Sequence, residues 1–208
     1  MTTVAVIAKE CRPGRVKTRL TPPYTPEQAA ALAEAALVDT LEAVAALPVD
    51  RRVLYFDGDT VPEAARGFDV LAQPGGGLDE RLAHLFDAVA EPLLLVGMDT
   101  PQLVPAHVAP ALDAGADADA WLGPATDGGF WALAMREPDG APIRGVPMSR
   151  EDTGRRQLER LRAAGLRVGM LGELTDVDTA GSAASVAREA PGTRFAQLLG
   201  RLSPGGAP

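Results

Sequence analysis

The sequence is poor in several residue types on which common classes of protein depend. It has one cysteine in 208 residues, so no disulfide can form within the chain and a reducing compartment is expected. Aromatic residues make up only 4%, which predicts a core built from alanine, valine and leucine. No apolar run reaches the ~20 residues of a membrane-spanning helix, and the N-terminus lacks a secretory signal pattern. We therefore expect a soluble, cytoplasmic protein without a membrane partner.

Histidine and positive charge are also scarce. The two histidines, His84 and His107, fall in predicted helices without the spacing of a metal site or a catalytic triad, so we interpret both as structural or surface residues. The net charge is -8, which argues against a nucleic-acid partner, because such proteins are basic over a whole face. No serine lies in a Gly-x-Ser-x-Gly elbow.

Against this acidic background, positive charge is concentrated near the N-terminus. An apolar run at 4–8 predicts a strand buried on both faces, as in a parallel sheet. The next segment, residues 9–20, which we call the basic loop, holds five of the 20 Lys and Arg residues. They are Lys9, Arg12, Arg15, Lys17 and Arg19. Gly14 lets the backbone of this loop approach a ligand closely.

Charge alone allows two interpretations of the basic loop. It is either a solvated surface loop or a polyphosphate site built from lysines and arginine forks. It is neither a Walker A loop nor a dinucleotide-binding glycine fingerprint, because both glycine spacings are absent. Cys11 lies inside the loop, where neighbouring cations are expected to lower the pKa of its thiol.

The remaining pattern alternates strands and helices, which predicts one α/β domain over 1–202 and a flexible tail at 203–208. A helix starts at Thr25-Pro26 with an N-cap and a first-turn proline. The expected strands are 4–8, 52–56, 69–72, 92–97, 119–123, 130–134 and 166–171. Three of the expected helices are defined by where they end, at about 47, about 89 and about 164. A fourth is expected to open at Pro101, and the others cover 62–66, 183–190 and 194–202.

Acidic residues follow several of these strands. Asp99 stands at the carboxyl end of the most apolar strand, where ligands of open α/β sheets bind, so it is either a Mg²⁺ ligand or the cap of a helix opened by Pro101. Asp178, in Asp176-Val177-Asp178-Thr179, has the same two interpretations. Asp57 and Asp59, separated by a glycine, are more typical of a turn than of a metal pair.

Glycine-rich and polar loops supply further candidates. Gln73 precedes a proline and three glycines at the start of a helix, which suits anion or base recognition or a flexible turn. Residues 124–130 form a polar loop that is also explained as a hairpin turn. Ser149 and Asp152 resemble a capping box, and Arg150 between them is a candidate to reach an acceptor.

Four blocks of sequence together resemble a known family. They are Lys-x4-Gly-x-x-Lys-Thr-Arg-Leu in the basic loop, Gly-Met-Asp-Thr-Pro at 97–101, Gly-Pro-Ala-Thr-Asp-Gly-Gly-Phe at 123–130, and Asp-Val-Asp-Thr at 176–179. In this order they resemble nucleotide-diphospho-sugar transferases of the GT-A fold, and more closely the family DUF2064, which is linked to glycosyl transfer and arsenosugar biosynthesis. The resemblance covers roughly residues 2 to 190.

This resemblance implies a mostly parallel α/β sheet in a three-layer sandwich, with nucleotide at the carboxyl ends of the first, third and fourth strands. It implies Mg²⁺ (or Mn²⁺) held by Asp99 and Asp178, and catalytic charge neutralisation by Arg15, Lys17 and Arg19 together with Asp99. The remaining candidates bind substrate. They are Lys9, Gly14, Gln73 and Gly77 for the nucleotide, and Asp127, Gly128, Gly129 and Arg150 for the acceptor.

The resemblance leaves the reaction open. The first hypothesis is a Mg²⁺-dependent nucleotidyltransferase that moves a nucleoside monophosphate from a triphosphate to a small anionic acceptor and releases pyrophosphate. The alternatives are a nucleotide-sugar-dependent glycosyltransferase with Asp127 as acid or base, a non-catalytic nucleotide-binding module, and a transferase acting on another phosphorylated substrate such as phosphoenolpyruvate in organoarsenic metabolism. In the last case Cys11 is a candidate soft ligand for a metalloid.

Overall fold

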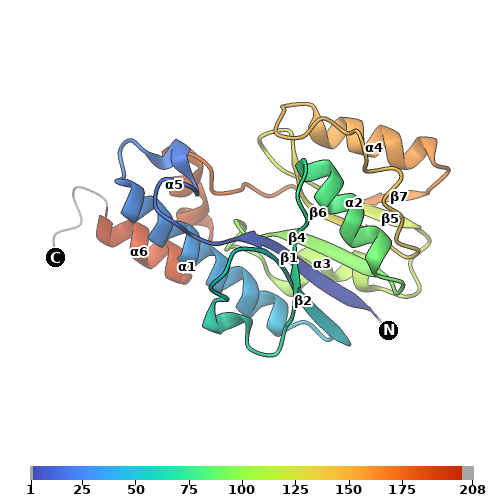
Figure 1. The fold of residues 1–208 in the computed structure, drawn as a ribbon, viewed down its shortest axis with the longest axis horizontal. Coiled ribbons are helices and arrows are strands. Elements are labelled where there is room, and N and C mark those ends of the chain that lie inside the picture. The colour runs from blue at the N-terminus through green and yellow to red at the C-terminus, as the bar shows by residue number, and fades with distance from the viewer. Residues whose placement is uncertain (1, 203–208) are drawn as a thin grey trace.

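The computed structural model describes residues 2–202, so the tail predicted at 203–208 lies outside the described residues. Its centre is a seven-stranded sheet in the order β3-β2-β1-β4-β6-β5-β7 (Figure 1). The strands are β1 (Thr3–Lys9), β2 (Arg51–Asp57), β3 (Asp69–Ala72), β4 (Leu93–Gly97), β5 (Ala120–Pro124), β6 (Phe130–Met135) and β7 (Val168–Met170). Only β6 runs antiparallel to its neighbours, β4 and β5. This is the mostly parallel sheet that the sequence predicts.

Residues 2–202 also form six α-helices and two short 3₁₀ helices, of which α5 and α6 follow the last strand. They are η1 (Thr18–Leu20), α1 (Pro26–Ala45), η2 (Glu63–Ala65), α2 (Leu78–Ala88), α3 (Pro105–Leu112), α4 (Thr153–Ala163), α5 (Ala180–Glu189) and α6 (Arg194–Leu202). The predicted start of α1 is confirmed, because Thr25 caps it and forms a reciprocal capping box with Gln28. Among the described residues, no helix combines the length and the apolar character needed to cross a membrane.

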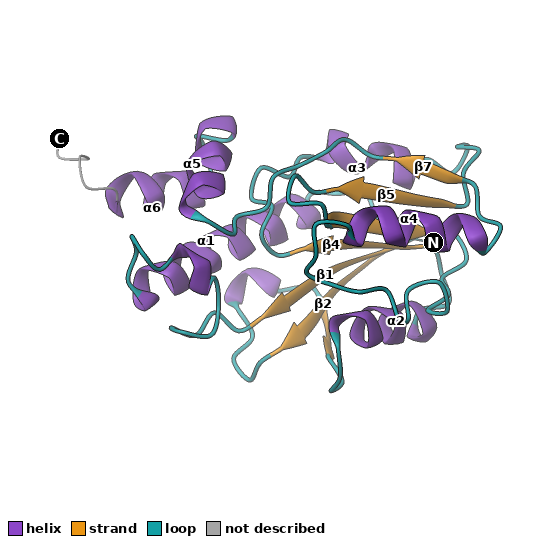
Figure 2. Cartoon of the chain, turned by 90° about the horizontal axis from the view of Figure 1, so that it is seen from above, coloured by secondary structure: helices purple, strands orange, loops and turns teal. Residues whose placement is uncertain are grey.

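The central strands are buried on both faces, and their side chains alternate between two cores. Val4 and Val6 of β1 belong to a core under α1 and α3, whereas Ala5 between them belongs to a core under α2 and α4. Leu94 and Leu95 of β4 divide in the same way. This period of two, with helices on both faces, produces the three-layer sandwich of the GT-A type that the sequence predicts (Figure 2).

Helices α5 and α6 pack on the first half of α1, at the end of the molecule away from β7 (Figures 1 and 2). Asp39 of α1 is buried and accepts hydrogen bonds from the backbone N–H groups of Arg194 (3.1 Å) and Phe195 (2.9 Å). These are the first two residues of α6, whose N-terminal N–H groups have no partner within the helix. Asp39, a residue of α1, therefore caps the N-terminus of α6.

Two expected features at helix starts are wrong. Pro101 does not open a helix: it lies in a turn, residues 98–104 contain no helix, and α3 begins at Pro105. Ser149 and Asp152 do not form a capping box, because α4 begins at Thr153 and its N-cap, Asp152, makes no side-chain capping bond. Ser149 instead adopts a left-handed backbone with φ of 57°.

Candidate functional site

A cleft of about 1040 Å³ lies where the strand order reverses, beyond the carboxyl ends of β1 and β4. The reversal arises because the chain leaves β1 towards β2 on one side and returns to β4 on the other, and such points form ligand crevices in open α/β sheets. Its lining includes ten of the residues predicted from the sequence. They are Lys9, Arg15, Lys17, Arg19, Gln73, Asp99, Asp127, Gly129, Arg150 and Asp178.

The basic loop is held in place by its apolar residues. Val16 and Leu20 are almost completely buried, so the cationic residues between and beside them are fixed relative to the core. Lys17 has a left-handed backbone, with φ of 47° and ψ of 43°. Such a conformation is uncommon for a residue with a side chain and marks a constrained position.

Lys17 reaches across the cleft to Asp99, and its Nζ donates to Oδ2 at 2.5 Å. The Lys17 side chain is only 10% exposed. Burial lowers the pKa of the Lys17 ammonium, but the carboxylates of Asp99, Asp178 and Asp176 outweigh it, so the pKa is raised and the group stays charged. Asp99 is thus a cleft carboxylate, and its interpretation as a helix cap is wrong because no helix starts beside it.

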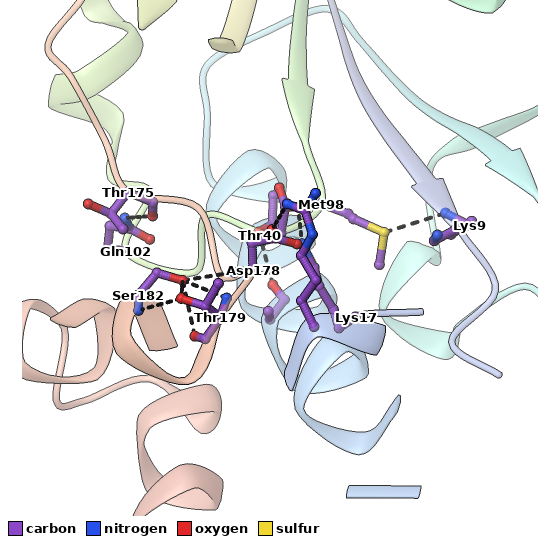
Figure 3. Close-up of polar contacts among 12 residues, drawn as sticks. Lys9, Lys17, Thr40, Met98, Gln102, Thr175, Asp178, Thr179 and Ser182 are labelled. Carbon is purple, nitrogen blue, oxygen red and sulfur yellow. Dashed lines mark hydrogen bonds and ion pairs between the residues drawn. The ribbon is translucent and has the colours of Figure 1, made fainter. Parts of the chain in front are cut away.

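A second ion pair ties the basic loop to the late acidic segment. Arg19 donates to Asp178 Oδ2 at 2.7 Å, and this contact raises the pKa of the Arg19 guanidinium. The backbone N–H of Asp178 donates to Ser182 Oγ, which holds this segment against the start of α5 (Figure 3). One residue earlier, the N–H of Val177 donates to the backbone oxygen of Asp99 at 3.0 Å. Both acidic segments therefore lie together at the cleft.

Sequence reasoning missed Asp176 as a candidate, although it stands in the quoted motif. It lines the cleft, and its pKa is raised to about 6 by burial first, and then by the negative charges of Asp99 and Asp127. Lys17 opposes this rise. Three carboxylates and one ammonium therefore interact in the cleft, and Asp176 sits in a position typical of functional sites. The signal in the sequence was the Asp-x-Asp spacing, which places both acids on the same side of an extended segment.

Two cations of the cleft remain free for a ligand. In the described part of the chain, the side chains of Lys9 and Arg15 make no hydrogen bond or ion pair, and both are exposed. Arg19 is also 71% exposed despite its pair with Asp178. Arg12, by contrast, turns away to Glu10 and Asp59, each at 2.8 Å. The loop thus divides its cations between those committed to carboxylates and those open to an anion.

Gln73 has a structural task at the cleft edge. Its Nε2 donates to the backbone oxygens of Ala8 and Tyr55, both at 2.8 Å, and its Oε1 accepts from Arg81 at 3.1 Å. Both amide hydrogens are used on neighbouring strands, so only Oε1 can still meet a ligand. Asp57 ends β2 and accepts from Arg81, and Asp59, in the bend that follows, accepts from Arg12, so both carboxylates are held in ion pairs.

The glycine candidates divide between the cleft and its supporting structure. Gly129 lines the cleft, and its N–H donates to Asp127 Oδ1 at 2.8 Å. Gly128 does not appear on the lining: it has φ of 88°, and a Cβ there would lie 2.0 Å from the backbone oxygen of Glu151. Gly14 and Gly77 are likewise absent from the described lining. Contacts of Gly14, Gly77 and Gly128 with substrate stay predictions. At position 128 the backbone itself explains the glycine, because a side chain would meet Glu151.

Cys11 differs from the expectation. Its pKa is raised to about 12, first by burial and then by Glu34, and the nearby Lys9 and Lys17 do not compensate. The thiol packs beside Val16 against Ala30 and Ala33 of α1. A thiolate nucleophile or metalloid ligand is therefore disfavoured at neutral pH, because both require the deprotonated sulfur.

The histidines take no part in the cleft lining. His84 is exposed on α2, and His107 accepts a hydrogen bond from the N–H of Val104 and meets Trp131 edge-on at 6.4 Å between ring centroids. These contacts agree with the interpretation of His107 as a structural residue.

The acidic residues of the cleft fit a divalent cation only in part. Within residues 2–202, no group of three or more His, Cys, Asp or Glu side chains is arranged to hold a metal ion alone. Asp99 and Asp176 are nevertheless close enough for one to raise the pKa of the other. Mg²⁺ suits such a pair, because it takes few protein ligands and fills the remaining positions with water and phosphate oxygens.

The family model described as "Uncharacterized protein conserved in bacteria (DUF2064)" matches residues 31–150, more than half of the chain. The chain belongs to this family. The matched region includes Gln73, Asp99 and Asp127 but neither the basic loop nor Asp178. No curated protein matches the sequence.

Solved structures share the fold. A candidate nucleotide-diphospho-sugar transferase from Desulfovibrio desulfuricans G20 has a TM-score of 0.83 and 25% identity, over 95% of this chain and 93% of the other. CMP:2-keto-3-deoxy-manno-octonic acid synthetase complexed with CTP has a TM-score of 0.54 and 14% identity, over 90% and 97%. Rv0371c from Mycobacterium tuberculosis H37Rv complexed with manganese has 0.53 and 20%, also over 90% and 97%. The last two establish similarity of fold alone.

Proposed function

We propose that the protein is a transferase that moves a nucleoside monophosphate from a nucleoside triphosphate to a small anionic acceptor, with release of pyrophosphate and with the help of Mg²⁺ or Mn²⁺. The observation that carries this proposal is the meeting of the basic loop and the acidic segments in one cleft. Free cations suit a polyphosphate, and carboxylates beside them suit a metal that also binds phosphate. The two neighbours above that contain CTP and manganese give analogy of fold, not of chemistry.

The residues divide into roles on this basis. Lys9 and Arg15 bind phosphate oxygens, and Lys17 and Arg19 add charge that stabilises the transition state. Asp99, with Asp176 or Asp178, holds the metal. The ion supplies positive charge beside the reacting phosphate when it is bound. Gln73 orients the nucleotide through its remaining acceptor oxygen, and Arg150 and Asp127 contact the acceptor.

A nucleotide-sugar-dependent glycosyltransferase is the second candidate. It is favoured by the neighbour from Desulfovibrio desulfuricans, which is similar over nearly the whole of both chains. In that case Asp127, an exposed carboxylate on the cleft, acts on the acceptor hydroxyl. The basic loop favours the first candidate, because a triphosphate carries more negative charge than a diphosphate joined to a sugar.

The test is a thermal-shift panel with the four nucleoside triphosphates and common nucleotide-sugars, each with and without Mg²⁺. A ligand at about 100 times its dissociation constant stabilises the folded state by about 2.7 kcal/mol. We expect a Mg²⁺-dependent shift with one triphosphate, and its loss in Asp99→Asn. Pyrophosphate release with candidate acceptors then measures turnover.

The matched control is Asp117→Asn, because Asp117 is highly exposed and lies outside the cleft lining. It is expected to keep the full shift. A response to nucleotide-sugars alone supports the glycosyltransferase instead, and no response to any nucleotide contradicts both candidates.

A further inference from the structure

The lining of the cleft has a second part whose chemistry differs from that of the basic loop. Three apolar side chains from three elements line it, and we call them the apolar wall. They are Leu78, the first residue of α2, Phe130, the first residue of β6, and Met148, in the segment before α4. The proposed transfer to an anion assigns no role to any of them.

The apolar wall is partly open to solvent. Leu78 is 37% exposed, and Phe130 and Met148 are half-buried. Phe130 and Met148 pack against the same core cluster, which also contains Leu82, one turn after Leu78 on α2. Phe130 and Met148 therefore continue this core into the cleft, and Leu78 lies on the same cleft lining as Leu82. Exposed apolar surface in a concave site is typical of ligand contact.

Hydrogen bonds between the supporting segments fix this wall. The N–H of Gly145 donates to Asp79 Oδ2 at 2.9 Å, which joins the segment carrying Met148 to the first turn of α2. The N–H of Gly154 donates to the backbone oxygen of Gly128 at 2.8 Å, which joins the start of α4 to the loop before Phe130. The wall is therefore formed before a ligand arrives, which reduces the entropy cost of binding.

The segment 150–152 beside the apolar wall holds one cation, Arg150, and two carboxylates, so it adds no excess of positive charge. Arg150 Nε lies 3.3 Å from Asp152 Oδ1, and Glu151 between them also lines the cleft. The basic loop, by contrast, offers free cations in Lys9 and Arg15. A polyanion is thus directed to the basic loop, whereas the apolar wall suits a molecule of low charge. A cleft of about 1040 Å³ exceeds what one small ligand usually fills, so both can bind together.

We infer that the apolar wall binds the acceptor, and that the acceptor is amphipathic: a single oxyanion carried on an aryl or alkyl skeleton. This inference rests on the proposed nucleotidyl transfer. The acceptor oxyanion forms a bond to the α-phosphorus, the bond from that phosphorus to the bridging oxygen breaks, and pyrophosphate leaves with the electron pair. Polyhydroxylated acceptors are disfavoured, because their hydroxyl groups lose water against apolar side chains without gaining partners.

The test measures binding of phenyl phosphate, glucose 1-phosphate and inorganic phosphate to the full chain by saturation-transfer NMR and calorimetry, without nucleotide. We expect phenyl phosphate to bind about tenfold more tightly than the other two. Met148→Ser and Leu78→Ser each remove apolar contact and are expected to weaken phenyl phosphate about fivefold. Met170→Ser is the matched control, because Met170 is 47% exposed on β7 and lies outside the cleft lining.

Two results would overturn the inference. One is glucose 1-phosphate binding as tightly as phenyl phosphate, and the other is phenyl phosphate binding unchanged in Met148→Ser. A thermal shift with nucleoside triphosphates on the same variants separates this inference from the proposed function. If Leu78→Ser weakens only the nucleotide, the wall serves the nucleotide and the inference is wrong. If no variant responds to nucleotide while phenyl phosphate behaves as expected, the proposed function fails and the subsite remains.

Discussion

At the scale of single residues, Asp176 is expected to lower the free energy of unfolding of the protein when its carboxyl group is charged. Its pKa is about 6 in the folded protein against 3.8 for an ordinary aspartate, so the folded state binds the proton more tightly. The contribution of Asp176 to the free energy of unfolding is therefore greatest below pH 3.8. It falls as the pH rises from 3.8 to about 6 and stays low above pH 6.

Asp176→Asn removes that cost. In metal-free buffer we expect the variant to be more stable than the parent by about 1–2 kcal/mol above pH 7, and equally stable near pH 4, measured by urea unfolding at both values. Glu63→Gln, at an exposed ion pair, is the control and is expected to change stability little at either pH. A variant that is less stable above pH 7 would contradict the electrostatic interpretation.

Gly128 and Gly154 are the residues that join the two loops behind the apolar wall. In Gly128→Ala the new Cβ meets the backbone oxygen of Glu151 at 2.0 Å, and φ of 88° adds strain. We expect a loss of about 2–4 kcal/mol in the free energy of unfolding.

Gly172→Ala is the comparison, because its Cβ has no neighbour within 4 Å and its backbone has no positive φ. Calorimetry should find it within about 0.5 kcal/mol of the parent. Equal stability of Gly128→Ala and the parent would require that Glu151 moves freely, which would also loosen the wall.

At the scale of elements, α6 depends on a residue far away in sequence. Asp39→Ala leaves the first two N–H groups of α6 without their buried acceptor, so we expect a loss of about 2–3 kcal/mol by thermal or chemical unfolding. Glu42→Ala removes only the exposed partner of Arg194 and is expected to cost less than about 0.5 kcal/mol. Similar losses in both variants would contradict the capping role of Asp39.

The strands were predictable because each central one is buried on both faces and therefore reads as a continuous apolar run. The start of α3 was not, since Pro101 and Pro105 carry the same local signal. The structure keeps Pro101 in a turn, where Gln102 Nε2 donates to the backbone oxygen of Thr175 at 2.6 Å. A contact spanning more than seventy residues cannot be read from local sequence.

The site was predictable where it depends on the carboxyl ends of strands. Lys9 ends β1 and Asp99 lies two residues after β4, and these neighbouring strands are parallel, so both residues lie at the carboxyl ends of the strands. The environment of Asp176 was not predictable, because it depends on burial and on the neighbouring carboxylates Asp99 and Asp127. The packing of Cys11 against α1 was not predictable either, because it depends on residues that are distant in the sequence.

At the scale of the whole molecule, the cleft presents exposed cations, Lys9 and Arg15, on a protein whose net charge is -8. We expect triphosphate affinity to fall about tenfold or more between about 0.05 and about 0.5 M salt, because exposed cations are screened. Binding of phenyl phosphate, which relies on apolar contact, is expected to change less. Calorimetry of both ligands over one salt series makes the comparison, and equal slopes would contradict a division of the cleft into two chemical parts.

The ion pair of Arg19 with Asp178 joins residues 159 positions apart. During synthesis Arg19 emerges long before Asp178, the carboxylate that pairs with it. A chain interrupted before Asp178 would leave Arg19 without its partner and would lack the last acidic segment of the cleft lining. If the proposed function holds, such truncated products are expected to bind polyanions without turning them over.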